Sequence, residues 1–268
     1  MDNIEKLEQI VTNAKQWILD AGAQIRQSFT TNTLEINFKE NPSDLVTDMD
    51  KQIEKFFIKK INETFPKHRI LGEEGFGDDV KSLEGTVWII DPIDGTMNFV
   101  HMKRHFAISV GIYHNGSGVV GLIYDVVNDE LFSGIKGKGA FLNEQPLKKL
   151  QAIEIKEAVI GMNAGWLLEK ERIHPSILPP LIQSVRGTRS FGSAAIELAY
   201  VASGKIDGYI SLRLSPWDFA AGKVIIEEVG GHVTTICGEQ LVLLNKQTPL
   251  FAARPGLHSE IVNNYIKN

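Results

Sequence analysis

Two aspartates follow an apolar run in the segment 88–96, which reads Trp-Ile-Ile-Asp-Pro-Ile-Asp-Gly-Thr. The apolar residues predict a buried strand, and Pro92 is expected to end that strand at Asp91 because proline removes a backbone donor. Asp94 stands three residues after Asp91. Two carboxylates on one rigid turn repel each other strongly unless a cation lies between them. The pair therefore indicates a cation site.

The rest of this turn offers a further oxygen ligand and a place for a phosphate. Hard carboxylate oxygens suit magnesium, and the carbonyl of Ile93 is a further candidate ligand. Gly95 permits backbone conformations closed to other residues. The amides of Gly95 and Thr96 and the Thr96 hydroxyl are candidates for contact with a phosphate. Pro-x-Asp-Gly is also an ordinary surface turn, and the segment alone does not decide between the two interpretations.

Four further acidic residues in three segments supply context, although each segment has a structural explanation of its own. Glu73 and Glu74 end a short predicted strand, so that one can be a ligand while the other supports it, or both can lie at a solvated edge. Asp218 stands three residues after Ser215, which is the spacing of a capping box at a helix start, and it can equally reach outward to a metal. Asp50 lies in the first turn of a predicted helix, where an acid stabilises the helix dipole.

Together these segments resemble the motif set of the lithium-sensitive, metal-dependent phosphatases, and the chain is most similar to the inositol monophosphatase family. In chain order the motifs are Asp50, Glu73-Glu74, Asp-Pro-Ile-Asp-Gly-Thr at 91–96, Trp217-Asp218 and, after eleven residues, Gly230-Gly231. Segments 39–47, 98–101 and 192–195 also look like family segments. The similarity runs from the first predicted helix almost to the C-terminus.

The resemblance implies a magnesium-dependent phosphomonoesterase that holds up to three Mg²⁺ ions. The first ion would be held by Glu73, Asp91 and the Ile93 carbonyl. The second ion would be held by Asp91, Asp94 and Asp218, so that Asp91 bridges the two ions. Glu73 and waters would hold a weaker third ion, and the loop at Lys39 is assigned to that region. One ion activates the attacking water and another stabilises the leaving alkoxide.

The resemblance also implies roles in catalysis and in substrate binding. Asp50 and Thr96 would orient and deprotonate the attacking water, with Glu73 assisting. The residues expected around the substrate lie in the acidic turn and in the C-terminal half of the chain; they are Ile93, Asp94, Gly95, Thr96, Gly192, Ser193, Ala194, Ser211 and Asp218. The substrate is expected to be inositol monophosphate or a related small phosphorylated metabolite.

One departure from the family pattern puts the substrate in question. Inositol-specific members carry a glutamate seven residues before the Trp-Asp aspartate, and this chain has Ser211 there. An NADP(H) phosphatase, alone or as a second activity, and a fructose-1,6-bisphosphatase therefore remain alternatives. A non-catalytic binding protein on the same scaffold is a more distant one, because the carboxylates expected to act are all present: Asp50, Glu73, Asp91, Asp94 and Asp218.

Periodicity predicts the elements that must position these residues. Apolar residues spaced by three and four predict helices near 4–25 and 47–65. Strands are expected at 70–71, 87–90, 107–113, 119–127 and 131–135, joined by short turns that favour antiparallel pairing. Strands and helices alternate after residue 150. We therefore expect an α/β (α+β) fold of two halves, 1–150 and 151–268, with the site between them. The resemblance implies a layered αβαβα sandwich, with an antiparallel N-terminal sheet and a mixed C-terminal sheet, and a homodimer.

Composition excludes several other classes of function. The 268 residues carry a net charge of -5, which disfavours a nucleic-acid surface because such a surface needs a basic stripe. A single cysteine, Cys237, excludes an internal disulfide and fits a reducing compartment. We see neither a secretory signal nor an apolar run of the ~18 residues needed to span a bilayer. A cytoplasmic protein without a membrane partner is expected.

Overall fold

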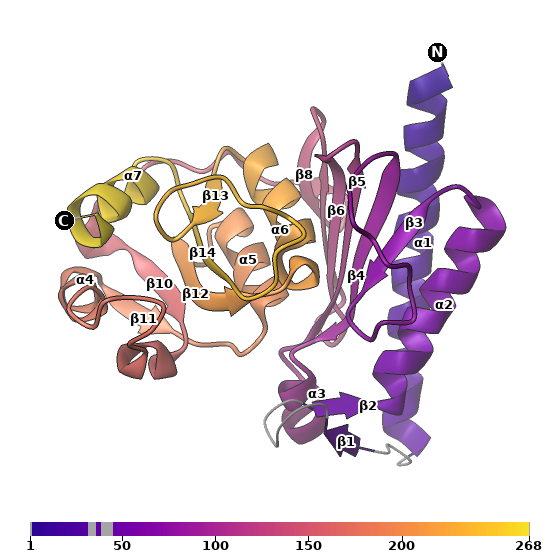
Figure 1. Cartoon of the computed structure of the whole chain (residues 1–268), viewed down its shortest axis with the longest axis horizontal. Coiled ribbons are helices and arrows are strands. Elements are labelled where there is room, and N and C mark those ends of the chain that lie inside the picture. The colour runs from indigo at the N-terminus through magenta and orange to yellow at the C-terminus, as the bar shows by residue number, and fades with distance from the viewer. Residues whose placement is uncertain (1, 32–35, 39–44, 268) are drawn as a thin grey trace.

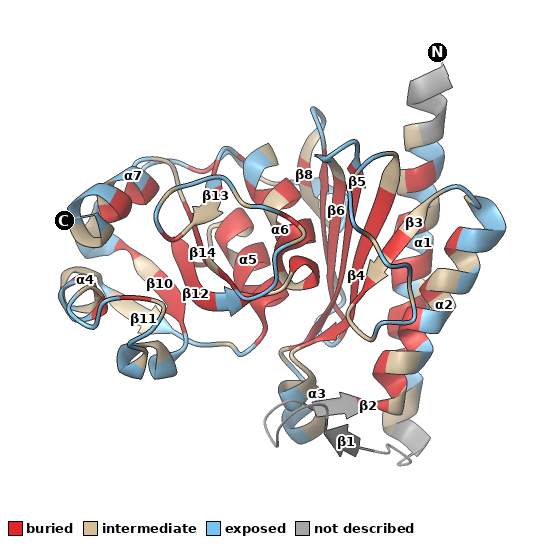
Figure 2. Cartoon of the chain, in the orientation of Figure 1, coloured by how far each residue is buried: buried red, intermediate tan, exposed pale blue. Residues whose placement is uncertain are grey.

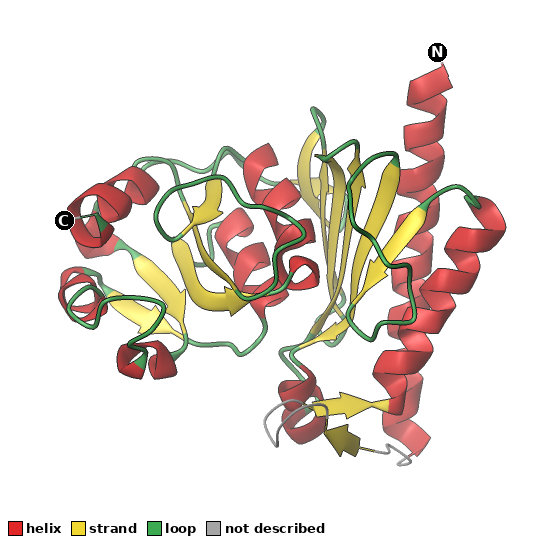
Figure 3. Cartoon of the chain, viewed as in Figure 1, coloured by secondary structure: helices red, strands yellow, loops and turns green. Residues whose placement is uncertain are grey.

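The computed structural model describes residues 2–31, 36–38 and 45–267, and its helices and sheets alternate in five layers (Figure 1). In order, these layers are a pair of helices, a seven-stranded sheet, a second pair of helices, a five-stranded sheet and an outer group of short helices. Figure 3 shows the same alternation by element type. The αβαβα sandwich expected from the sequence is therefore confirmed.

The first layer contains two amphipathic helices, α1 (Asp2–Thr31) and α2 (Asp48–Thr64). On α1 the apolar stripe is buried completely at Ala14, Ile18, Ala21 and Ile25. These side chains recur every three or four residues, so they form one face of the helix. That face and its counterpart on α2 form one hydrophobic core with the seven-stranded sheet.

The seven-stranded sheet carries its strands in chain order from β3 to β9. The strands are β3 (Arg69–Gly72), β4 (Thr86–Asp94), β5 (Ala107–His114), β6 (Ser117–Asp125), β7 (Glu130–Ile135), β8 (Gly139–Leu142) and β9 (Gln145–Pro146). All neighbouring pairs are antiparallel except β3 and β4, which are parallel. The pair is parallel because segment 73–85 carries the chain back to the end of the sheet at which β3 begins, so β4 runs in the same direction.

Strand β4 is buried on both faces, which explains its continuous apolar sequence. Trp88 and Ile90 pack in the core that contains α1 and α2, whereas Val87 and Ile89 pack in the core on the opposite face. Successive side chains of a strand point to opposite faces, so both faces of this sheet need a helical cover. Figure 2 shows the resulting buried centre of the molecule.

The middle layer consists of α5 (Ala194–Ser203) and α6 (Pro216–Glu228). Glycines in the sheet let α6 approach closely: a Cβ atom on Gly121 would lie 2.3 Å from the Ala221 carbonyl oxygen, and one on Gly134 would lie 2.7 Å from the Ile225 Cα. Side chains larger than hydrogen at these glycines would push the helix away from the sheet. The close approach brings the first turn of α6 next to the sheet.

The five-stranded sheet covers the other side of the middle helices, in the order β11-β10-β12-β14-β13. Its strands are β10 (Val159–Met162), β11 (Gly187–Arg189), β12 (Gly208–Leu214), β13 (His232–Thr235) and β14 (Thr248–Ala253). Strand β10 is parallel to β11 and β12, and the β12–β14 and β13–β14 pairs are antiparallel. The outer layer contains α4 (Leu178–Ser184) and α7 (Leu257–Ile261), which continues into a π-helical turn, Val262–Ile266.

Three sequence expectations need correction or completion. The sheet of the N-terminal half is mixed rather than antiparallel throughout, because of the β3–β4 pair. Strand β4 does not end at Asp91; it continues to Asp94 through an irregular register beside Pro92, and a bulge is where a strand tolerates a residue without an N–H. A short helix, α3 (Thr96–Met102), then follows. The two-half division at residue 150 stays a prediction.

Periodicity did not predict several short strands. These are β8, β9 and β11 together with a two-stranded antiparallel pair, β1 (Ile36–Phe38) and β2 (Leu45–Thr47). Strands of two to four residues carry too few side chains for alternation to be visible. Lys39, which was assigned to the region of a third ion, lies outside the described residues.

Candidate active site

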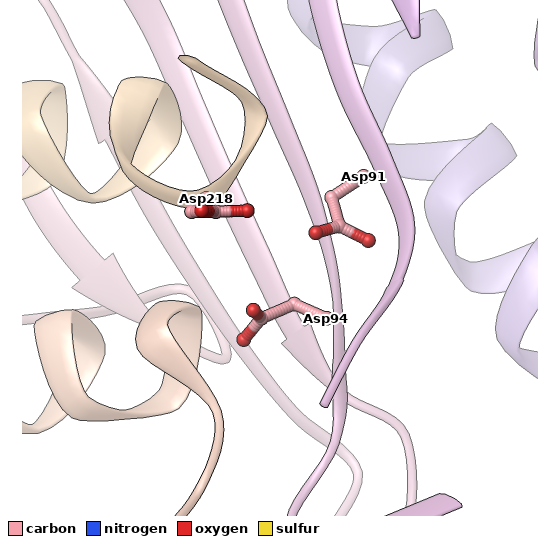
Figure 4. A group of neighbouring side chains, drawn as sticks. All are labelled: Asp91, Asp94 and Asp218. Carbon is pink, nitrogen blue, oxygen red and sulfur yellow. The ribbon is translucent and has the colours of Figure 1, made fainter. Parts of the chain in front are cut away.

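Three aspartates gather between β4 and the first turn of α6 (Figure 4). Asp91, Asp94 and Asp218 each offer a carboxylate oxygen, and these oxygens all lie within 4.8 Å of one another. Asp91 and Asp94 are buried, and Asp218 is partly exposed. The fold thus unites two motifs that are more than a hundred residues apart in the sequence.

The bulge in β4 lets both of its aspartates serve one site. The register with β5 shifts between Asp91 and Asp94, and such a bulge re-aims the side chains that follow it. The Ile93 amide donates to Asp91 Oδ1 at 3.0 Å. Asp94 Oδ2 accepts hydrogen bonds from the Ser193 hydroxyl and, at 2.8 Å, from the Ala195 amide. Asp94 is therefore held by the N-terminal turn of α5.

Asp218 is held in place by its own helix and by the neighbouring sheet. Its Oδ2 accepts the Ser215 amide at 2.7 Å, in the capping arrangement expected from the spacing. The Ser109 hydroxyl on β5 donates to the Trp217 carbonyl at 3.1 Å. The start of α6 is thereby tied to the sheet that carries Asp91 and Asp94.

Burial and mutual repulsion make the aspartates reluctant to ionise in the metal-free protein. Burial raises the pKa of Asp91 well above its ordinary value, and the negative charges of Glu73, Asp94 and Asp218 raise it further. Burial also raises the pKa of Asp94 to about 6, against the lowering effect of its hydrogen bonds from Ser193 and Ala195. A positive charge at this site would reverse these shifts.

The donor set fits a hard divalent cation. Carboxylate and carbonyl oxygens are the ligands that Mg²⁺ and Ca²⁺ prefer, and these ions need few protein ligands when waters complete the shell. The Ile93 carbonyl accepts the Thr96 hydroxyl at 3.1 Å, and a carbonyl has a second lone pair for another partner. The acidic cluster Asp91, Asp94 and Asp218 could thus hold a metal ion.

Asp50 and Thr96, which the family resemblance assigns to the attacking water, lie within hydrogen-bond distance of each other. Asp50 is fully buried, and its Oδ2 accepts the Thr47 amide at 2.8 Å and the Thr47 hydroxyl at 2.5 Å. The Thr96 hydroxyl lies 3.2 Å from the other oxygen, Oδ1. The carboxylate is thus fixed by the first turn of α2, with one oxygen presented to Thr96.

Glu73 lies beside Asp91, close enough to raise the pKa of that residue both by its charge and by a side-chain hydrogen bond. Its carboxylate is not part of the group of three that lies within 4.8 Å. The backbone after β3 turns sharply at this point, and the Glu73 amide donates to the Ile90 carbonyl at 3.2 Å. Glu73 is therefore placed by the parallel pairing of β3 with β4.

Sequence reasoning missed Glu54, which shapes the same turn. Glu54 is fully buried on α2, and its two carboxylate oxygens accept the Glu74 amide at 2.7 Å and the Phe76 amide at 2.8 Å. A Cβ atom on Gly72 would lie 2.4 Å from the Glu54 carboxyl carbon. A signal was present: Glu54 falls four residues after Asp50, on the face of the helix that is otherwise apolar.

A cavity of about 230 Å³ opens next to the acidic cluster. Its lining includes Asp94, Asp218 and four residues expected around the substrate, Gly192, Ser193, Ala194 and Ser211. Gly95 lies near this lining, because a Cβ atom on Gly95 would be 3.2 Å from the Gly192 carbonyl oxygen. Six of the nine residues predicted around the substrate therefore line one hollow, whereas Ile93, Gly95 and Thr96 are not part of its lining.

The cavity lining also includes Tyr209, Arg213 and Glu197, which sequence reasoning missed. Tyr209 and Arg213 flank Ser211 at two-residue spacing on β12, so strand alternation could have identified them. Glu197 is buried on α5, and its Oε1 accepts the Phe191 amide at 2.9 Å. Burial raises the pKa of Glu197 to about 7. The lining is thus strongly acidic on the side of the cluster.

Comparison with known proteins gives a consistent result. The model of the "Inositol monophosphatase family" matches residues 6–267. The "Inositol-1-monophosphatase" of Bacillus subtilis (strain 168) is 56% identical over 266 residues, which cover 99% of this chain and 98% of that protein. The crystal structure of inositol monophosphatase II from Staphylococcus aureus MSSA476 superposes with a TM-score of 0.88 at 41% identity, covering 97% of this chain and 96% of that chain.

A more distant solved structure shares the fold as well. An IMPase/NADP phosphatase complexed with Mg²⁺ and phosphate superposes with a TM-score of 0.87 at 26% identity, covering 96% of this chain and 95% of that chain. Among the described residues of our chain, no helix is long and apolar enough to cross a membrane.

Proposed function

Because the chain belongs to the inositol monophosphatase family and is a phosphoric monoester hydrolase, we propose that it hydrolyses inositol monophosphate and related small phosphate monoesters in a magnesium-dependent reaction. The observation that carries this proposal is the cluster of Asp91, Asp94 and Asp218 at the edge of a cavity. A solved structure of SaIMPase-II, 39% identical to this chain, holds inositol monophosphate, which supports the substrate class.

The residues proposed to hold magnesium are those of the acidic turn and its neighbours. They are Glu73, Asp91, the carbonyl of Ile93, Asp94 and Asp218, for up to three ions. Bound Mg²⁺ supplies positive charge that makes water more acidic and offsets the negative charge of the leaving oxygen. It also relieves the repulsion that raises the pKa of Asp91 and Asp94 in the metal-free protein.

Asp50 and Thr96 are proposed to orient the attacking water and to take its proton. The Thr96 hydroxyl has one hydrogen to donate and two lone pairs. When it donates to Asp50 Oδ1, at 3.2 Å, its lone pairs can accept a hydrogen from a water. A proton can then pass from the water to Thr96 while the Thr96 proton passes to Asp50. The Thr47 hydrogen bonds hold Asp50 in the geometry that this relay needs.

The substrate is proposed to lie with its phosphate at the acidic turn and its alcohol in the cavity. The amides of Gly95 and Thr96, at the start of α3, would face the phosphate. Asp94 and Asp218 border both regions. The Gly192, Ser193, Ala194 and Ser211 lining would contact the alcohol.

A phosphate-release assay tests the proposal. Purified protein is incubated with inositol 1-phosphate, with and without magnesium, and with EDTA. We expect release only when magnesium is present, together with inhibition by lithium, which the family resemblance implies. Undiminished release in EDTA would contradict the metal assignment, and indifference to lithium at tens of millimolar, roughly, would mean that the second metal site differs from the family's.

A phosphatase that also accepts NADP(H) is the second candidate. The neutral Ser211 lines the cavity where inositol-specific members have a glutamate, so an anionic substrate meets less repulsion there. SaIMPase-II has also been solved with bound 2′-AMP, at 39% identity, and the 2′-phosphate of NADP has the same chemistry. The same assay with NADP and with fructose 1,6-bisphosphate separates these candidates.

Assembly and location are proposed on the family resemblance and on composition. A homodimer is expected, and light scattering of the purified protein tests it. The lone Cys237, which is exposed, fits a reducing compartment, and a cytoplasmic location follows from that.

A further inference from the structure

We propose that Arg213 and Trp166 form a second subsite, which binds an anionic group carried by the alcohol part of the substrate. This inference rests on the proposed phosphatase function and names its substrate class. The favoured substrates are phosphate monoesters whose alcohol bears a further phosphate, as in a sugar bisphosphate or a nucleoside bisphosphate.

The charges of the cavity are unevenly distributed along its lining. Asp94, Asp218 and Glu197 are acidic. Among the described residues that line the cavity, Arg213 is the single lysine or arginine. Asp94 and Asp218 are proposed to hold magnesium at the first phosphate, so Arg213 is the fixed positive charge that the described lining offers to a second phosphate.

The Arg213 side chain is held in place by an aromatic ring and not by an acid. Its guanidinium carbon lies 5.5 Å from the centre of the Trp166 ring, a distance at which a cation is attracted to the ring face. Among the described residues, no ion pair or hydrogen bond involves the Arg213 side chain. Arg254, in contrast, lies 2.6 Å from Asp207. The Arg213 guanidinium thus keeps its donors for a ligand while its orientation is already restricted.

Strand alternation explains why Arg213 reaches the cavity, since it follows Tyr209 and Ser211 at two-residue spacing and all three line the cavity. The register of β12 with β14 shifts between Ser211 and Leu214, so that β12 has one extra residue there. The bulge brings Leu214 to the cavity lining next to Arg213, and bulges are often found next to functional sites. Arg213 is exposed although its strand neighbours Leu212 and Leu214 are buried.

The chemistry of the guanidinium favours a phosphate over a neutral hydroxyl. Arginine offers five donors in a planar fork, which matches two oxygens of a phosphate or carboxylate, and it has no acceptor. A sugar hydroxyl can accept hydrogen bonds from the guanidinium, but it leaves the positive charge without a counter-charge. Inositol monophosphate would therefore gain little from Arg213, whereas a bisphosphate would gain a charge-assisted pair.

Matched pairs of substrates test the subsite. The first pair is fructose 1-phosphate and fructose 1,6-bisphosphate, and the second is adenosine 2′-phosphate and adenosine 2′,5′-bisphosphate. Initial rates of phosphate release give kcat/KM for each substrate with the wild type, Arg213→Ala and Arg213→Lys. Lys246→Ala serves as the control, because Lys246 is also exposed and lies 5.1 Å from a tryptophan ring, that of Trp217, but does not line the cavity.

For at least one pair we expect Arg213→Ala to lose tenfold or more in kcat/KM on the bisphosphate, equivalent to ~1.4 kcal/mol, mainly through KM. The monophosphate of that pair should change less than ~2-fold, and Arg213→Lys should recover part of the loss because it keeps the charge without the fork. Lys246→Ala should resemble the wild type. Equal losses on both members of each pair, or no loss on either bisphosphate, would overturn the subsite.

Failure of the proposed function gives a different result. In that case the wild type releases no phosphate from any of these substrates or from inositol 1-phosphate in magnesium. Binding of the same matched pairs is then measured by calorimetry. A preference for the bisphosphate that disappears in Arg213→Ala supports the subsite independently of catalysis, and a preference that survives the substitution overturns it.

Discussion

Replacing Asp94 by asparagine should stabilise the metal-free protein and inactivate the enzyme. Asp94 is buried, and in the folded protein its pKa is raised from 3.8 to about 6. An acid with a raised folded-state pKa contributes stability at low pH and loses it as pH rises through that value. Ionised Asp94 is therefore a cost to the metal-free fold above about pH 6, and asparagine does not carry that cost.

The magnitude follows from the size of the shift. A shift of about two pKa units corresponds to ~3 kcal/mol, since each unit is worth 1.36 kcal/mol. Above about pH 7 we expect Asp94→Asn to raise the free energy of unfolding of the metal-free protein by up to that amount, which is roughly 5–10 °C in Tm for a chain of this size. The difference should vanish near pH 4, where Asp94 of the wild type is protonated.

The same substitution should abolish the metal ligand. Asp94 Oδ2 accepts the Ser193 hydroxyl and the Ala195 amide, so the single oxygen of asparagine is needed for these donors. Its NH₂ group then points to the side where a cation would lie. We expect turnover to fall by at least ~100-fold, as when one electrostatic stabiliser is removed from an active site.

Thermal unfolding in EDTA from pH 4 to pH 8, paired with phosphate release in magnesium, measures both effects. Asp79→Asn is the control, because Asp79 is an exposed acid whose partner is Lys81. A metal-free Asp94→Asn protein that is less stable than the wild type at pH 8, or a Tm difference that does not depend on pH, would refute the electrostatic reasoning. Near-wild-type turnover would refute the ligand role.

Two further substitutions separate the relay from the turn that supports it. Thr96→Val keeps the shape of the side chain but removes the hydroxyl between Asp50 and Ile93. We expect kcat to fall by roughly 10²-fold, with little change in the magnesium concentration that gives half-activity. A large change in that concentration would contradict the relay. Glu54→Gln removes one of the two acceptors for the Glu74 and Phe76 amides, so we expect a loss of ~1–3 kcal/mol in stability and a higher magnesium requirement. Glu63→Gln, on the exposed side of the same helix, should leave both unchanged.

Much of the fold could be predicted from the sequence, because its long elements carry clear periods. The apolar stripe of α1 and the continuous apolar run of β4 match the faces that the structure buries. The parallel β3–β4 pair could not be predicted, because it depends on how the segment 73–85 returns to the sheet edge. The continuation of β4 past Pro92 was also missed, since a proline has the same local signal at a bulge as at a strand end.

The site residues that belong to a sequence motif could be predicted, whereas those that only tertiary packing brings to the site could not. The motif residues Asp91, Asp94 and Asp218 meet as expected, although two of them come from β4 and the third from α6. Glu54 and Arg213 belong to no motif of the family resemblance. Glu54 is recognisable only as an acid on a buried helix face, and Arg213 is recognisable only by its two-residue spacing from Ser211 on β12.

The structural interpretation of two motif acids is confirmed, and it is compatible with the functional one, which stays a prediction. Asp50 is a capping residue of α2, and its Oδ2 accepts the Thr47 amide at 2.8 Å. Asp218 occupies the equivalent place on α6, and its Oδ2 accepts the Ser215 amide at 2.7 Å. A carboxylate has two oxygens, so one can be fixed by the helix start while the other is directed into the site. Capping limits the side-chain rotation that a relay or a metal ligand would otherwise have to lose on binding. If the proposed roles hold, the structural role is therefore the means by which the second oxygen is positioned.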